Sequence, residues 1–156
     1  MTDTRPTLYV SCRLPDPVMA IIRDRFQLVQ DPHDTLPTAP VLREGLCQAD
    51  AGIVTLGDRI DAETIHAATR LKILANYAVG YNNIDLAAAK RRGLIVTNTP
   101  DVLTDATADL TWALLLATAR RVVEGDALVR SGHWTGWSPT QLLGAEISGK
   151  TLGIIG

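Results

Sequence analysis

The chain has 156 residues, of which 46% are hydrophobic, and this is enough apolar material for the core of one domain and part of another. Its 15 Lys and Arg residues nearly balance its 17 Asp and Glu residues, the formal net charge is -2, and no basic cluster stands out. This balance excludes the strongly basic surface that is typical of proteins that bind nucleic acid or acidic membranes.

Short apolar segments alternate with amphipathic segments between residues 8 and 97. Strands are expected at residues 8–11, 28–30, 51–56, 71–75 and 94–97. A helix is expected at residues 15–26, with Val18, Ile21 and Ile22 on one face. A short helix that ends at residue 47 is expected after the Pro-rich loop at 31–40, and two more helices are expected at residues 61–68 and 85–92. The alternation predicts right-handed crossovers and a parallel sheet covered on both faces, which is an α/β fold.

Two of these helices carry clear end signals. Asp61 is a good N-cap, and Glu63 lies in the first turn, where the helix dipole favours negative charge. Gly93 follows the helix at 85–92, and we expect it to end that helix because glycine adopts a C-cap conformation without strain.

Pro100 interrupts the alternation, and a different kind of segment follows. Residues 104–120 predict a long, largely apolar helix, and residues 122–131 predict a second helix. The loop after them contains Trp134 and Trp137, large aromatic side chains that usually anchor a loop against another surface. We expect the first domain boundary near residues 99–101.

The C-terminal run K-T-L-G-I-I-G, residues 150–156, predicts a short apolar strand that reaches Gly156. A dinucleotide-binding fingerprint needs such a strand, followed by G-x-G-x-x-G at the start of a helix, because closely spaced glycines let the pyrophosphate approach the backbone. Only the strand and the first glycine are present in the sequence. Many strands end in glycine without binding a nucleotide, so the run alone leaves both interpretations open.

The run N-Y-A-V-G-Y-N-N-I-D, residues 76–85, is the most plausible place for chemistry. It follows the fourth predicted strand, and ligands of open α/β sheets collect at the carboxyl ends of strands. Gly80 permits a positive φ or the close approach of a ligand, and the amides of Val79 and Gly80 together suit a carboxylate. The alternative is a plain loop in which Asn83 and Asp85 cap the next helix.

The cysteines and the N-terminus indicate the compartment. Cys12 and Cys47 are far apart, with no C-x-x-C and no close histidine pair, so neither a zinc site nor a disulfide framework is indicated. Residues 1–6 are polar and lack the apolar run of a signal peptide. The most apolar stretch, residues 106–119, is shorter than the roughly 20 apolar residues that a bilayer requires. We therefore expect a cytoplasmic protein with no metal site and no membrane or nucleic-acid partner.

Three segments recur together in one known family. They are A-V-G-Y-N-N-I-D-L-A-A-A-K-R-R-G-L-I-V-T-N-T-P-D-V-L-T-D-A-T-A-D-L-T-W-A-L-L-L-A-T-A-R-R at 78–121, G-H-W-T-G-W-S-P at 132–139 and L-G-A-E-I-S-G-K-T-L-G-I-I-G at 143–156. In this order they resemble the D-isomer-specific 2-hydroxyacid dehydrogenases, and most of all their glyoxylate and hydroxypyruvate reductase branch. The resemblance extends from about residue 51 to residue 156.

The resemblance implies a fold and a domain plan. In this family a flavodoxin-like parallel-sheet substrate domain is split in sequence around an inserted Rossmann domain, which binds NAD or NADP. Residues 1–99 would then be the N-terminal part of the substrate domain. Residues 100–156 would be bridging helices and the first strand of the cofactor domain, and that domain would be truncated after this strand. Complete subunits of the family commonly form homodimers through helices of the inserted domain.

The same resemblance assigns ligand-binding residues. The backbone amides of Val79 and Gly80 would hold the substrate carboxylate. Val79, Thr107 and Gly156 would lie beside the cofactor, although Thr107 also suits an ordinary place in the first turn of a helix. Trp134 and Trp137 would pack between domains or subunits.

The family's catalytic arginine, glutamate and histidine would lie beyond residue 156. His33, His66 and His133 do not occur in a context that matches the family's catalytic histidine, and we expect solvated or capping roles for them. The residues of this chain therefore include binding groups but no predicted catalytic ones.

Two hypotheses follow. In the first, the chain is the N-terminal fragment of an NAD(P)-dependent oxidoreductase that reduces a short 2-keto acid, glyoxylate or hydroxypyruvate, to the D-2-hydroxy acid. In the second, it is a non-catalytic α/β interaction domain or an inactive truncated product that pairs through the helix at 106–120. The first predicts little or no turnover by the isolated chain.

Overall fold

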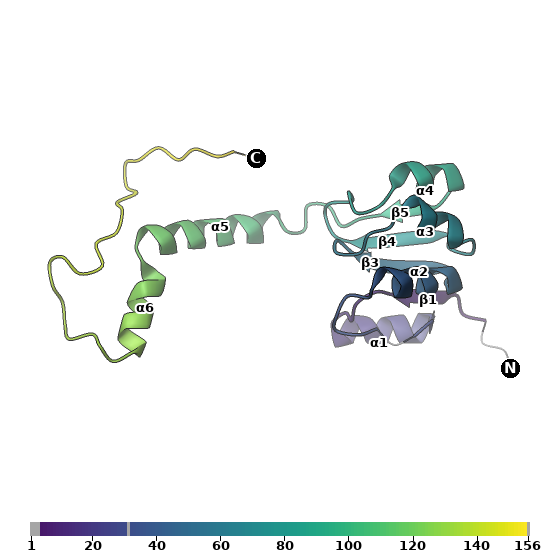
Figure 1. Ribbon diagram of the computed structural model, residues 1–156, viewed down its shortest axis with the longest axis horizontal. Helices are drawn as coiled ribbons and strands as arrows, with labels where there is room; N and C mark the ends of the chain where they lie inside the picture. Colours follow the sequence, from purple (N-terminus) through teal and green to yellow (C-terminus); the bar gives the residue numbers. More distant parts are fainter. Residues whose placement is uncertain (1–3, 31, 156) are drawn as a thin grey trace. The chain divides into compact units, whose positions relative to one another are not determined.

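Five parallel strands organise the first of the two units into which the chain divides, Met1–Val102 and Leu103–Gly156. The computed structural model describes residues 4–30 and 32–155. The strands are β1 (Thr7–Val10), β2 (Gln27–Leu28), β3 (Ala51–Thr55), β4 (Ile73–Tyr77) and β5 (Ile95–Thr97). They lie in the order β2-β1-β3-β4-β5, and Figure 1 labels the last four of them. This is the order of flavodoxin-like sheets, so the predicted fold class is confirmed.

The register of the sheet aligns the carboxyl ends of its central strands. Val10 pairs with Ile53, Ile53 pairs with Ala75, and Ala75 pairs with Thr97. Because all these strands are parallel, the loops that leave them emerge at one edge of the sheet, where ligands of open α/β folds bind. The loop after β4 is one of them.

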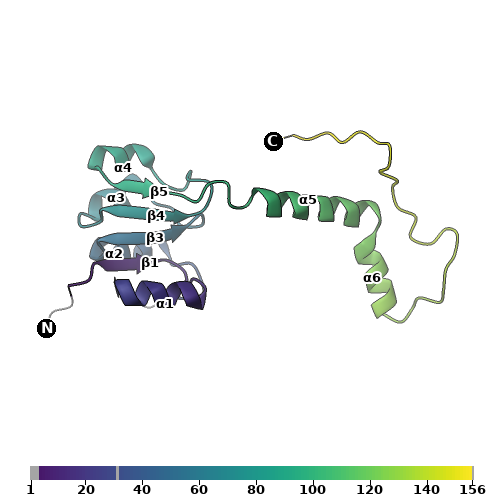
Figure 2. The same ribbon diagram turned by 180° about the vertical axis from the view of Figure 1, so that it is seen from behind.

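Four helices connect these strands and lie on both faces of the sheet. They are α1 (Asp16–Arg25), α2 (Ala39–Gln48), α3 (Ala62–Ala67) and α4 (Leu86–Arg92). Helix α1 lies on the face that Figure 2 presents, and α2 and α3 lie on the face that Figure 1 presents. The predicted helix ends are confirmed: Asp61 accepts a hydrogen bond from the Thr64 amide at 2.8 Å, and Gly93 has a left-handed φ of 73°. The Thr64 amide also holds the pKa of the Asp61 carboxyl below its usual value.

Two hydrophobic clusters lie on opposite faces of the sheet. The larger joins the sheet to α2, α3 and α4, and its fully buried members include Tyr9, Leu46, Val54, Ile65 and Leu74. The smaller lies under α1 and consists of Leu8, Val10, Met19 and Ile22.

The predicted apolar face of α1 was wrong for two of its three residues. Ile22 is buried, but its core partner on the helix is Met19, whereas Val18 and Ile21 are 41% and 57% exposed. Residues three apart on a helix share one face, so Met19 and Ile22 point into the core together. Val18 and Ile21 lie on the neighbouring stripe.

The sheet is not fully covered on the α1 face, contrary to the sequence-based expectation. Side chains alternate between the faces along a strand, and Ile73, Tyr77 and Ile95 belong to the α1 face. They are 36%, 60% and 58% exposed among the described residues, because α1 packs over β1 and its neighbours rather than over β4 and β5. Within the described residues of the first unit, no helix covers this apolar part of the sheet.

The second unit contains two helices, α5 (Thr104–Ala119) and α6 (Val122–Arg130). Arg121 joins them with a left-handed φ of 54°, and its guanidinium bonds the carboxylate of Glu124. No residue of either helix is buried, although α5 is mostly apolar. None of the helices formed by residues 4–30 and 32–155 has both the length and the apolar character needed to span a bilayer.

The predicted C-terminal strand is not formed. Residues 151–155 have no regular secondary structure, and Gly156 lies outside the described residues. A strand requires a hydrogen-bonded neighbour, and the described part of the second unit contains no other strand for it to pair with.

Tyr9 makes a tight contact at the centre of the larger cluster. Its ring lies against Gly45, where a Cβ atom would come within 2.1 Å of the ring. Its hydroxyl is buried and has no hydrogen-bond partner among the described residues. Burial and, to a smaller extent, the charge of Asp58 raise the pKa of Tyr9 to about 12.

We expect Tyr9→Phe to raise the free energy of unfolding at neutral pH by about 1 kcal/mol, because it removes a buried hydroxyl that has no partner. The raised folded-state pKa of Tyr9 adds a second expectation: stability should fall in the wild type as pH rises from 10.0 towards about 12, and Tyr9→Phe should lose less. Urea unfolding followed by circular dichroism measures both effects. Tyr81→Phe, at an exposed tyrosine, is the control, and a large destabilisation by Tyr9→Phe at neutral pH would show that the hydroxyl has a partner.

Candidate functional site

The loop of residues 78–84 leaves the carboxyl end of β4 at the shared edge of the sheet. It ends at Asp85, whose side chain accepts a hydrogen bond from the Ala88 amide at 2.8 Å and so caps α4. The capping role expected for Asp85 is confirmed. Asn83 does not cap this helix, and its side chain binds other parts of the same edge.

Three successive carbonyl groups of this loop accept hydrogen bonds from the rest of the unit. The Ala78 carbonyl accepts from the Thr99 amide at 2.9 Å. The Val79 carbonyl accepts from Asn98 Nδ2 and the Gly80 carbonyl from Asn76 Nδ2, both at 2.8 Å. The carbonyls therefore turn towards the neighbouring segments.

This arrangement fixes the direction of the next amides. A trans peptide places the N–H of one residue opposite to the C=O of the residue before it. The anchored carbonyls of Ala78 and Val79 thus direct the amides of Val79 and Gly80 away from the groups that hold them. Among the described residues, no group accepts a hydrogen bond from either amide. Two adjacent, unused and fixed N–H donors are suited to bind an anion.

Gly80 does not need its glycine for backbone geometry. It is absent from the glycines with positive φ, and a Cβ atom there would make ordinary contacts, 3.5 Å from Asn82 and 3.7 Å from Leu56. Of the two reasons for a glycine that the sequence left open, close approach of a ligand to the backbone is the one that fits.

The buried carboxylate of Asp58 stabilises the same edge of the sheet. Asp58 is 2% exposed, and its Oδ2 accepts hydrogen bonds from Ser11 Oγ at 2.6 Å, the Thr55 amide at 2.7 Å and Thr55 Oγ1 at 3.0 Å. Asn83 Nδ2 donates to the carbonyls of Thr55 and Asp58 at 3.1 and 3.0 Å. The ends of β1 and β3 and the loop after β4 are therefore joined by one polar network.

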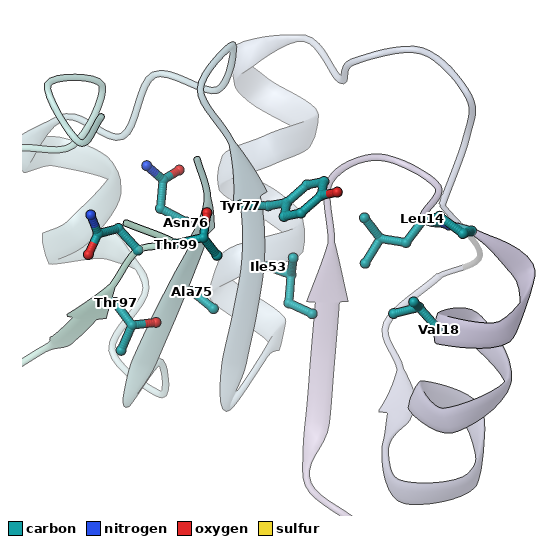
Figure 3. A pocket seen from close by; sticks show the side chains of 10 residues that line it. Leu14, Val18, Ile53, Ala75, Asn76, Tyr77, Thr97 and Thr99 are labelled. Carbon is teal, nitrogen blue, oxygen red and sulfur yellow. The ribbon is translucent and has the colours of Figure 1, made fainter. Parts of the chain in front are cut away.

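An apolar pocket of about 270 Å³ lies beside this edge on the α1 face. In Figure 3 the side chain of Tyr77 projects from β4 towards Leu14, with Ile53 beneath it. Asn98 and Thr99 contribute to the lining and also anchor the carbonyls of Val79 and Ala78. The same two residues thus line the pocket and hold the carbonyls that direct the two free amides.

The remaining predicted site residues, Thr107 and Gly156, belong to the second unit. Thr107 is exposed on α5 in the second unit, where its carbonyl accepts a hydrogen bond from Thr111 Oγ1, and its role at a cofactor stays a prediction. Gly156 lies outside the described residues. His66 and His133 make local contacts, with the Ala62 carbonyl and Ser131 Oγ, at 2.6 and 3.0 Å.

No group of three or more His, Cys, Asp or Glu side chains in residues 4–30 and 32–155 is arranged to hold a metal ion. Sequence reasoning missed three residues of the polar edge, which are Ser11, Asp58 and Asn98, and it gave Asn76 no role of its own although Asn76 begins the run at 76–85. One signal was available: Asn76 directly follows an apolar strand pattern, where a polar side chain needs a buried partner.

Comparison with protein families identifies one family model over most of the chain. The model of the D-isomer specific 2-hydroxyacid dehydrogenase catalytic domain matches residues 8–145. The glyoxylate reductase of Thermococcus kodakarensis is 46% identical over 156 residues, which cover 97% of this chain and 47% of that protein. The glyoxylate reductase of Aeropyrum pernix is 45% identical, with the same coverage. The chain spans about half the length of these curated relatives.

Solved structures agree with the sequence comparison. The TT0316 protein of Thermus thermophilus superposes with a TM-score of 0.83 and 44% identity, over 89% of this chain and 45% of that one. An NADPH-dependent glyoxylate/hydroxypyruvate reductase of Sinorhizobium meliloti, in complex with NADP and malonate, has a TM-score of 0.72 and 30% identity. It is matched over 95% of this chain and 45% of that one.

We expect Asp58→Asn to lower the free energy of unfolding by about 1–2 kcal/mol, because a neutral amide oxygen accepts the same hydrogen bonds more weakly than a carboxylate. Thermal unfolding of the chain measures the loss. Asp34→Asn, at an exposed aspartate, is the matched control and should leave the midpoint unchanged. Equal midpoints for the two variants would contradict a bracing role for Asp58.

Proposed function

Because the chain belongs to the D-isomer-specific 2-hydroxyacid dehydrogenase family, we propose that it is the N-terminal part of a reductase for a short 2-keto acid. Glyoxylate and hydroxypyruvate are the proposed substrates, NAD or NADP the proposed cofactor, and the corresponding D-2-hydroxy acid the product. The first unit would be part of the substrate domain, and the second would lead into the cofactor domain.

The pair of unused amides at Val79 and Gly80 is the observation that carries this proposal. Every 2-keto acid has a carboxylate next to the carbonyl that is reduced, and holding that carboxylate fixes the position of the carbonyl. Two N–H donors fixed by anchored carbonyls offer such a hold without a charged side chain. The malonate bound by the Sinorhizobium meliloti relative is also a small carboxylate.

The proposed division of labour follows from what the described residues offer. The nicotinamide supplies the hydride when it is bound. Val79 and Gly80 bind and orient the substrate, and Thr107 is the proposed contact of α5 with the cofactor. The arginine, the glutamate and the proton-donating histidine are proposed to belong to the portion of the relatives that this chain does not match. The isolated chain should therefore bind substrate weakly and not turn it over.

The exposed apolar side chains of α5 support a proposed homodimer. Leu110 and Leu114 are each 59% exposed and Trp112 is 53% exposed, which is unusual for side chains of this size on one helix. A second candidate function, a non-catalytic interaction domain that pairs through this helix, rests on the same exposure. We also propose a cytoplasmic location, which suits the free thiols of Cys12 and Cys47.

Titration of the ¹⁵N-labelled chain with glyoxylate tests the carboxylate site. We expect saturable shifts of the Val79 and Gly80 amide signals, because these two donors bind the anion. Gly80→Pro, which removes one N–H and with it the signal of residue 80, should abolish the shift of the Val79 signal, whereas Gly153→Pro in the second unit should not. Glycolaldehyde, which lacks the carboxylate, is the ligand control. Shifts of equal size with glycolaldehyde, or NADPH oxidation by this chain alone with glyoxylate, would contradict the proposal.

Self-association tests the role of α5. We expect the chain to show a mass that rises with concentration in light scattering, because apolar side chains on α5 are buried when two copies meet. Leu110→Glu with Leu114→Glu should hold it as a monomer. Asp105→Glu on the same helix keeps the charge and is the control. A chain that stays monomeric at every concentration would speak against both the homodimer and the interaction domain.

A further inference from the structure

Two asparagine side chains at the candidate site form a reciprocal pair. Asn76 Nδ2 donates to Asn83 Oδ1 at 3.2 Å, and Asn83 Nδ2 donates to Asn76 Oδ1 at 3.3 Å. Asn76 comes from β4 and Asn83 from the end of the loop that β4 leads into. The pair therefore joins the two ends of the stretch of residues 77–82.

The other hydrogen bonds of the two side chains connect the loop to the sheet. Asn76 Nδ2 also donates to the Gly80 carbonyl at 2.8 Å, and Asn83 Nδ2 also donates to the carbonyls of Thr55 and Asp58. Each of the two side-chain amides thus donates through its NH₂ group and accepts through its oxygen. A carboxylate at either position would lack the N–H groups that face these carbonyls.

The anchors of the loop differ in their exposure to water. The hydrogen bond from Asn98 to the Val79 carbonyl is exposed, so water competes for both of its groups. Asn76 is only 1% exposed, and its bond to the Gly80 carbonyl is part-buried. A hydrogen bond with a buried donor is more costly to break than an exposed one, because water does not readily replace the acceptor that the donor loses. Asn76 is therefore the firmer of the two side-chain anchors.

Gly80 is the residue that most needs such an anchor. Glycine has more backbone freedom than any other residue, so an unanchored Gly80 would rotate its N–H away from the direction in which a carboxylate binds. The Asn98 and Asn76 bonds fix the peptide planes before and after Gly80. Together they restrict both of its backbone dihedrals.

We propose that Asn76, held in place by Asn83, is a positioning residue. By holding the Gly80 carbonyl it limits backbone rotation at Gly80 and so helps to keep the Gly80 amide directed at the substrate carboxylate. This inference rests on the proposed carboxylate site. Asn76 does not itself touch the substrate, and its effect acts on the affinity for the keto acid rather than on the hydride-transfer chemistry.

Backbone ¹⁵N relaxation of the 156-residue chain tests the positioning directly. In the wild type we expect order parameters at Val79 and Gly80 close to the rigid value of about 0.85, and in Asn76→Ala a fall towards about 0.6. Asn83→Ala should give a smaller fall, and the effects of the two changes should not add, because both act through one pair. Asn82→Ala, at an exposed neighbouring asparagine, should change nothing. Unchanged order parameters in Asn76→Ala would overturn the proposal.

The signals of Val54 and Leu74 report whether each variant is folded. If Asn76→Ala loses them, Asn83→Ala, which leaves the strand residue in place, decides the question: order parameters at Val79 and Gly80 equal to the wild type would overturn the proposal. Lowered order parameters with intact core signals would support it.

Affinity for glyoxylate separates this inference from the proposed function. In the titration, the dissociation constant of Asn76→Ala should rise on the order of tenfold, the loss expected for one part-buried hydrogen bond, and that of Asn82→Ala should not change. In the complete enzyme the same variant should raise KM for glyoxylate with little change in kcat or in KM for the nicotinamide. A wild-type chain that does not bind glyoxylate would refute the proposed function, while the order parameters still decide the positioning.

Discussion

The planarity of the trans peptide bond is the constraint on which the candidate site depends. A peptide whose carbonyl is held must direct the following N–H to the opposite side, and the loop after β4 has three held carbonyls in succession. The donors that hold them come from Asn76 in β4 and from Asn98 and Thr99 just beyond β5. The parallel register brings these two strand ends side by side, since Ala75 pairs with Thr97. The direction of two amides is therefore a consequence of the sheet.

The two faces of the sheet differ in how completely they are buried. Helices α2, α3 and α4 cover one face with a continuous core, whereas on the other face Ile73, Tyr77 and Ile95 stay exposed beyond the reach of α1. Exposed apolar side chains of this size cost free energy that burial would recover, at roughly 25 cal/mol per Å². The same holds for α5, which has no buried residue. These two apolar surfaces belong to different units, and both are consistent with a chain that matches about half the length of its relatives.

The alternation of strands and helices was predictable because each element carries its own local signal. Asp61, Asp85 and Gly93 mark helix ends through side-chain or backbone properties that need no tertiary information. The bounds of β4 were predicted less accurately: the expected range of 71–75 is displaced from Ile73–Tyr77, because pairing with β3 and not the apolar run decides which residues extend. The predicted C-terminal strand is not formed for the same reason, since apolar residues form a strand only beside another strand with which they can pair.

The site was predictable only in part, because local patterns identify a loop but not what holds it. Val79 and Gly80 were predicted from the glycine in the loop after a strand and again through the resemblance, whereas the network of Asp58, Asn76 and Asn83 joins residues that the sequence separates by up to 25 positions. Asn83 had a local interpretation as a helix cap, and Asp85 took that role instead. A side-chain amide suits the position of Asn83 better than a carboxylate because it must donate to two carbonyls and accept from Asn76 at once. The identity of these residues follows from the hydrogen bonds of the assembled edge, because a side-chain amide donates and accepts at the same position.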